Sequence, residues 1–168
     1  MLDSLIKSKT RLRLLVKFFV NIANTGYLNG LALELGESTN SIRTELNNLT
    51  SAKYLKKKDV DNKVVYSANQ NHPLFPILQR IVRKHLGLEQ IVEKIFNEIG
   101  KPKKIVLIGD YAKGLDSGVI EILIVGNNIN KKYLDNLENK LTKLIDREVV
   151  FLVSNRIPKT HNLILFES

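Results

Sequence analysis

Apolar side chains recur at helical spacing between residues 38 and 55, where Ile42, Leu46 and Leu49 stand four and three positions apart. This spacing places them on one face of a helix. Ser38 precedes the pattern, and its hydroxyl can accept a backbone N–H that the first turn leaves unpaired. The sequence therefore predicts a helix that packs on one face. The opposite face carries short polar groups and one arginine: Thr39, Asn40, Ser41, Arg43, Thr44 and Asn47.

Two further helices are predicted upstream of this one. Residues 8–22 carry apolar side chains at helical spacing, and residues 28–35 form a shorter helix that Gly36 can end as a C-cap. Basic side chains crowd the start of the first helix, where they oppose the helix dipole. We therefore expect DNA phosphate or a partner subunit to compensate the charges of Lys7, Lys9, Arg11 and Arg13.

A basic β-hairpin is predicted directly after the polar helix, with strands over 56–60 and 63–66. Asp61 and Asn62 form its turn, because both tolerate the left-handed backbone that a two-residue turn requires. Exposed lysines face phosphates, which supply the sequence-independent part of DNA affinity. We expect these phosphate contacts from Lys53, Lys57, Lys58 and Lys63.

The helix over residues 28–35, the polar helix that follows it and the basic hairpin are together typical of a winged helix-turn-helix, which we expect over residues 1–70. Its polar helix face, residues 39–47, would contact bases or nearby phosphates in a major groove. The competing interpretation is an ordinary amphipathic helix and a solvated lysine run. The position of the lysines on a hairpin directly behind the helices favours the wing.

The second half of the chain is predicted to be a helical connector followed by a small mixed sheet. Residues 71–100 hold the connector helices, 74–85 and 88–99, whose apolar faces could also form a dimer seam. Strands are expected at 104–108, 119–125 and 148–153, with a candidate fourth at 161–166. A helix over 131–145 turns Leu134, Leu137, Leu141 and either Leu144 or Ile145 inward. The fold class is therefore α+β, with residues 101–168 as the last domain.

Composition narrows the function classes. The net charge is +9 and the pI is near 9.7, which favours a polyanionic partner. Lys and Arg exceed Asp and Glu by five in residues 1–72 and by three in residues 101–168, so the front half is the better nucleic-acid candidate. The chain has no cysteine, which excludes disulfides, thiolate zinc sites and cysteine nucleophiles. No targeting or membrane-spanning stretch is visible, so we expect a cytoplasmic protein with no metal and no cofactor.

The loop between the first two predicted strands of the last domain reads GDYAKGLDSG, residues 109–118. It resembles the Gly-Ser-x-Ala-x-Gly…Asp-x-Asp signature of the polymerase-beta-like minimal nucleotidyltransferase fold. The resemblance implies a loop that holds a triphosphate, followed by two acidic residues on the next strand and a third on a later strand, which together bind two magnesium ions. Two residues apart on a strand, both carboxylates would reach the same face.

This sequence departs from the signature at the positions whose side chains would bind phosphate and metal ions. Gly109, Ala112 and Gly114 match, but Asp110 replaces the serine and brings a negative charge to the phosphate position; Lys113 lies in the same loop. The first metal-binding aspartate falls on Val119, the second on Glu121 and the third near Val150. A single carboxylate cannot compensate two divalent ions for the water ligands that they would lose on binding. We therefore predict a degenerate, non-catalytic domain in which Glu121 pairs with Lys113 or Lys104.

The front half resembles an ArsR-like winged-helix regulator through GLALELGESTNSIRTELNNL, the basic hairpin and the ANQNHPLFPILQRIVRKHLGL junction. The resemblance implies a bacterial transcriptional regulator that binds specific double-stranded DNA. We expect a homodimer, because one recognition helix alone covers only a short half-site. The last domain would then serve interaction, dimerisation or sensing of an unidentified small-molecule or protein effector. The alternative is a residual nucleotidyltransferase that the winged helix targets.

Overall fold

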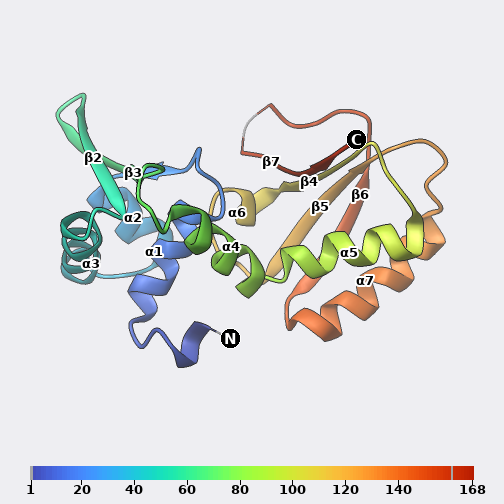
Figure 1. The fold of residues 1–168 in the computed structure, drawn as a ribbon, viewed down its shortest axis with the longest axis horizontal. Coiled ribbons are helices and arrows are strands. Elements are labelled where there is room, and N and C mark those ends of the chain that lie inside the picture. Colours follow the sequence, from blue (N-terminus) through green and yellow to red (C-terminus); the bar gives the residue numbers. More distant parts are fainter. Residues whose placement is uncertain (1, 160) are drawn as a thin grey trace. The chain divides into compact units, whose positions relative to one another are not determined.

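The computed structural model describes residues 2–159 and 161–168 and shows a mixed α+β protein with two sheets (Figure 1). The chain divides into two compact units, Met1–Val82 and Arg83–Ser168. The sequence analysis placed boundaries at residues 70 and 100 instead, with the connector as a separate part. The described residues contain no helix that is both long and apolar enough to cross a membrane.

The first unit consists of three helices, a three-stranded antiparallel sheet in the order β1-β3-β2, and most of a fourth helix that runs on into the second unit. Its core lies among the first three helices, where Leu14, Phe18, Leu31 and Ile42 are fully buried. The elements are α1 (Lys9–Phe19), β1 (Thr25–Gly26), α2 (Leu28–Leu35), α3 (Thr39–Ser51), β2 (Leu55–Val60), β3 (Lys63–Ala68) and α4 (Phe75–His85), after a short 3₁₀ turn, η1 (Leu2–Ser4).

The ends of these helices follow local side-chain chemistry. Ser38 caps α3 by accepting the backbone N–H of Ser41 at 3.1 Å, as predicted. Gly36 ends α2 in the left-handed conformation with φ of 62°, which a glycine adopts without a Cβ penalty. Helix α1 stops three residues before the predicted end. The Asn21 side chain accepts the Ala23 N–H at 3.1 Å just beyond it, a local bond that competes with continued helix.

The second unit is a four-stranded mixed sheet in the order β6-β5-β4-β7. Strands β5 and β6 are parallel and the other pairs are antiparallel, so the predicted mixed sheet is confirmed. Its fourth strand begins two residues later than expected. The elements are α5 (Leu88–Ile99), β4 (Lys104–Ile108), α6 (Gly109–Ala112), β5 (Val119–Val125), α7 (Lys131–Ile145), β6 (Glu148–Val153) and β7 (Leu163–Glu167).

Helices α5 and α7 pack side by side along one face of this sheet (Figure 1). The Phe96 ring of α5 meets the Phe166 ring of β7 edge-on, with centroids 4.7 Å apart. On α7, Leu134, Leu137, Leu141 and Ile145 are buried, whereas Leu144 is 56% exposed. Ile145 is therefore the inward residue of the predicted pair. Because α5 packs on α7, the second connector helix belongs to the core of this unit.

The opposite face of the sheet holds a second, smaller apolar cluster of Val106, Leu123 and Val125, with Ile108 and Ile157 packed against it. The same face carries Glu121, since alternate residues of β5 point to one side. In the parallel register of β5 and β6, Glu121 lies beside Val150. The positions that the nucleotidyltransferase resemblance aligns with carboxylates are thus neighbours in space, and Glu121 is the acidic one.

Candidate nucleic-acid interface

Helix α3 presents its predicted polar face to solvent. Thr39, Asn40, Arg43, Thr44 and Asn47 are exposed, and the Arg43 guanidinium donates to the Asn40 side-chain oxygen at 3.1 Å. Ser41 is half-buried, and its hydroxyl accepts from that of Ser38 at 2.9 Å. Five of the six predicted contact residues are therefore free to meet a ligand, and Ser41 is drawn back toward the helix start.

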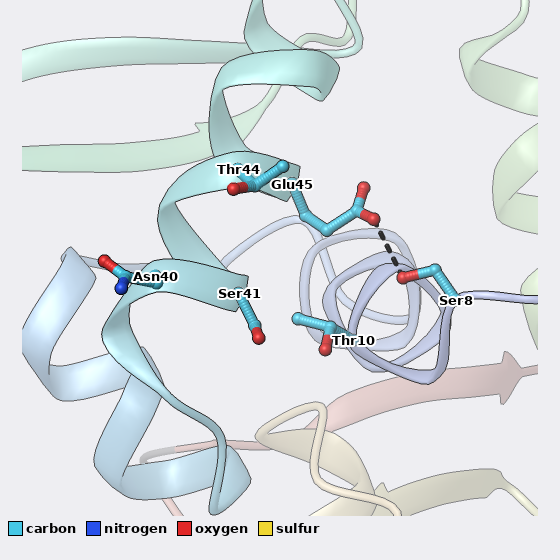
Figure 2. A pocket seen from close by; sticks show the side chains of 6 residues that line it. All are labelled: Ser8, Thr10, Asn40, Ser41, Thr44 and Glu45. Atoms are coloured by element: carbon cyan, nitrogen blue, oxygen red, sulfur yellow. Dashed lines mark hydrogen bonds between the residues drawn. The ribbon is translucent and has the colours of Figure 1, made fainter.

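The buried side of α3 is anchored to α1 by apolar packing and by one charged side chain. Ile42 and Leu46 are 0% and 1% exposed. Glu45, 8% exposed, accepts hydrogen bonds from the Ser8 hydroxyl at 2.8 Å and from Arg11 Nε at 2.8 Å. Figure 2 shows Glu45 reaching from α3 to Ser8 at the start of α1. The sequence analysis did not single out Glu45, because its partners lie more than thirty residues away.

Three of the four basic residues of α1 form ion pairs within the unit. Arg11 pairs with Glu45 at 2.8 Å and Arg13 pairs with Glu37 in the turn before α3. A third pair joins the buried Lys17 to Glu34 of α2 at 2.8 Å. The expectation that DNA or a partner subunit must compensate the charges of Arg11 and Arg13 is therefore wrong. Acidic residues of the α2–turn–α3 segment do so instead.

A groove of about 330 Å³ lies between the start of α1 and the first turns of α3. Figure 2 shows Ser8 and Thr10 on one side and the α3 side chains on the other. Its lining is polar, made of hydroxyls, one amide and the Glu45 carboxylate. The groove brings three of the predicted contact residues, Asn40, Ser41 and Thr44, beside the α1 residues Ser8 and Thr10.

The hairpin forms as predicted, with Asp61 and Asn62 at φ of 48° and 62° in its turn. Its lysines do not share one surface, because strand side chains alternate between the two faces. Lys56 and Lys58 lie on the face of Val65 and Ser67, their partners across the ladder. Lys57 lies on the opposite face with Asp59. The structure thus separates Lys57 from Lys58 and adds Lys56, which the predicted contact set lacked.

Lys63 shares the Lys56–Lys58 face and is held in place by an aromatic ring. Its ammonium lies 4.3 Å from the centroid of the Tyr27 ring, within the range of a cation–π contact. The same ring lies against Gly30, where an added Cβ would come within 2.9 Å of it. This close approach explains a glycine inside α2. Lys53 is exposed after α3 with φ of 62°.

In the second unit, the loop after β4 brings Gly109 against Glu121. Gly109 has φ of 67°, and a Cβ on it would lie 1.7 Å from Glu121 Oε2. The predicted lysine partners of Glu121 are engaged elsewhere: Lys104 pairs with Glu167 and Lys113 lies 3.9 Å from Asp110. The predicted pairing of Glu121 with either lysine is therefore wrong. Gly114, the last glycine of the motif, is buried and has φ of 80°.

A polar network that the sequence analysis missed fixes the far end of this loop. The Tyr111 hydroxyl donates to Asp116 and accepts from Arg147 Nε at 3.0 Å. Arg147 also donates to Asp116 Oδ2 at 2.9 Å. Burial and the hydrogen bond to Asp116 raise the pKa of Tyr111. Burial opposes ionisation of Asp116, but the hydrogen bonds from Arg147 and Tyr111 outweigh it and lower the pKa of that carboxyl.

Searches with protein-family models, curated proteins and solved structures found no match to this chain. Within residues 2–159 and 161–168, no group of three or more His, Cys, Asp or Glu side chains could hold a metal ion. The two family resemblances therefore stay predictions. The geometry of the two units is the basis of the function proposed below.

Proposed function

We propose that this protein is a transcriptional regulator whose first unit is a winged helix-turn-helix that binds specific double-stranded DNA. The observation that carries the proposal is the polar face of α3. It is exposed over three turns on a helix whose other face is packed against α1, and a lysine-bearing hairpin follows it. A helix with exposed amide, hydroxyl and guanidinium groups suits the hydrogen-bond pattern of base edges in a major groove.

The distribution of charge in the first unit supports the same proposal. Glu34, Glu37 and Glu45 are each paired with a basic residue of α1. These three glutamates are therefore not ion-pair partners of Arg43 on α3 or of the hairpin lysines. Lys56 and Lys58 share a face with Lys63, whereas Lys57 shares its face with Asp59. We therefore assign the phosphate contacts of the wing to the Lys56–Lys58 face, on which the described strands β2 and β3 place no carboxylate.

The second unit enters this proposal as a non-catalytic nucleotidyltransferase-like domain used for interaction, dimerisation or sensing. Glu121 has Val119 two residues before it on its own strand and Val150 beside it on the neighbouring strand. Of these three positions, which metal binding would need as carboxylates, only Glu121 is acidic. Asp110 stands at the phosphate position of the loop. The proposal includes a homodimer, since a single α3 covers only a short half-site.

The test is selection of bound sequences from a random duplex pool at two salt concentrations. An enriched motif with two inverted half-sites about one helical turn apart is the expected result. Binding without enrichment, lost steeply as salt rises, would contradict sequence-specific readout. Incubation with labelled nucleoside triphosphates and magnesium or manganese tests the enzymatic alternative. Incorporation that Glu121→Ala abolishes would overturn the non-catalytic assignment.

Three variants then separate base readout from phosphate contact. Arg43→Ala should cost about 1–3 kcal/mol on the selected site and relax specificity, while leaving random DNA nearly unaffected. The double change Lys56→Ala and Lys58→Ala should weaken binding to all sequences and reduce the salt slope by up to about 0.9 for each lost phosphate contact. Lys57→Ala is the control from the opposite hairpin face. A larger loss of slope for Lys57→Ala would place the phosphates on that face instead.

A further inference from the structure

An apolar cavity of about 260 Å³ opens in the first unit between α1, the end of α3 and α4. Its apolar lining comes from Leu15, Leu49, Ala52 and Leu78, with the ring of Tyr54 at one side. Leu15 and Leu49 are buried at 7% and 6% exposure. A cavity of this size is slightly smaller than the usual ligand pocket of about 300–1,000 Å³ and suits a compact molecule with a single ring or a short branched chain.

Three polar groups with unused hydrogen-bonding capacity stand around this lining. Arg11 uses Nε to reach Glu45, and its two terminal nitrogens make no hydrogen bond within the described part of the chain. The Asn48 side chain and the Tyr54 hydroxyl likewise have no hydrogen-bond partner among the described residues. The Tyr54 ring is held against the His72 ring at a centroid distance of 4.4 Å. Few but convergent polar groups over an apolar floor are the usual composition of a small-molecule site.

We propose that this cavity binds a small monocarboxylate with an aromatic or branched aliphatic body. The terminal nitrogens of a guanidinium form a planar fork that matches the two oxygens of a carboxylate. Glu45 occupies only the Nε side of Arg11, so the fork remains open to a second acceptor. The apolar body of the ligand would cover Leu15, Leu49 and Leu78 and remove them from water.

The site also touches the contact that fixes α3 on α1, because Arg11 is shared between the cavity and the buried Glu45. A ligand held by Arg11 has different affinities for the conformation in which α3 is packed on α1 and for one in which this contact is broken. A ligand with different affinities for two conformations shifts the equilibrium between them. The proposed ligand site does not depend on DNA binding. Its test uses the free protein, so its failure and that of the proposed regulator are separate results.

The experiment is a titration of the isotope-labelled full chain with benzoate, followed by NMR, with benzamide as the uncharged control of the same shape. We expect saturable shifts at Arg11 Nε–H, the Asn48 side-chain amide and the Leu78 methyls, with a dissociation constant of roughly 1 mM for so small a ligand. Benzamide should bind at least about tenfold more weakly, because it loses the charge-assisted pair. Equal affinity for the two molecules would overturn the carboxylate assignment.

Three variants locate the binding. Ala52→Leu fills the cavity without changing any charge and should abolish the shifts, while Asn48→Ala should weaken benzoate binding several-fold. Asn47→Ala is the matched control, since Asn47 lies on the same helix and does not line the cavity. Undiminished binding to Ala52→Leu, or an equal loss for Asn47→Ala, would overturn the site.

Discussion

Substitution of Gly109 by alanine tests the packing of the loop against β5. At φ of 67° the new side chain would occupy the left-handed region, and its Cβ would lie 1.7 Å from Glu121 Oε2. The backbone term costs about 1–2 kcal/mol for a non-glycine residue. Displacing the Glu121 carboxylate into another rotamer adds about 0.5–1.5 kcal/mol. The sum predicts a loss of roughly 1.5–3.5 kcal/mol in the free energy of unfolding of the second unit.

The two terms can be separated by a double-mutant cycle, because Glu121→Ala removes the overlapping atoms and leaves the backbone term. Gly109→Ala in the Glu121→Ala background should therefore cost only about 1–2 kcal/mol. Native-state hydrogen exchange of the buried β4 and β5 amides measures this, since these amides report opening of the unit that contains them. Costs that are equal in both backgrounds would refute the overlap of Gly109 with Glu121.

Two further predictions concern the charged networks. Glu45→Ala should destabilise the first unit by about 2–3 kcal/mol, because it removes two charge-assisted hydrogen bonds to a buried carboxylate, one of them from a partly solvent-screened Arg11. Urea unfolding followed by circular dichroism measures this loss. As a control, Asn47→Ala should change the free energy of unfolding by less than about 0.5 kcal/mol. Asp116→Asn should destabilise the second unit at neutral pH. The folded-state pKa of Asp116 is lowered, so its contribution is complete above about pH 4 and is lost as the pH falls below its folded value. The difference between wild type and variant should then shrink in acid, and a difference that stays constant from pH 7 to pH 2 would contradict this network.

Periodicity and capping residues were sufficient to predict most of the elements. The helix around Ile42, Leu46 and Leu49, its Ser38 cap and the Asp61–Asn62 turn all depend on residues close in sequence, where steric and hydrogen-bonding preferences act directly. Leu144 and Ile145 both fit the spacing of α7. Only packing against the sheet decides that Ile145 points inward.

Side-chain partners between distant elements were not predictable in this way. The Arg11–Glu45 and Asp116–Arg147 pairs join residues 34 and 31 positions apart, so no local pattern reveals them. The lysine partners expected for Glu121 were wrong for the same reason. Lys104 faces Glu167 because β7 adds to the sheet beside β4, a pairing that depends on strand order. The hairpin lysines needed the strand register before their two faces could be distinguished.

The pairing of acids in the first unit bears on how its net charge acts. Residues 1–82 hold twelve Lys and Arg against six Asp and Glu, and three of the six acids are bound to α1. A carboxylate and a cation in contact produce little field at a distance, because their opposite charges largely cancel outside the pair. The excess positive potential is therefore set by the cations left over, and these include Arg43 on α3 and the lysines of the hairpin. Arg11, Arg13 and Lys17 are paired with acids of the α2–turn–α3 segment, whereas Arg43 and the hairpin lysines stay exposed. This arrangement is suited to a polyanion that approaches α3 and the hairpin together.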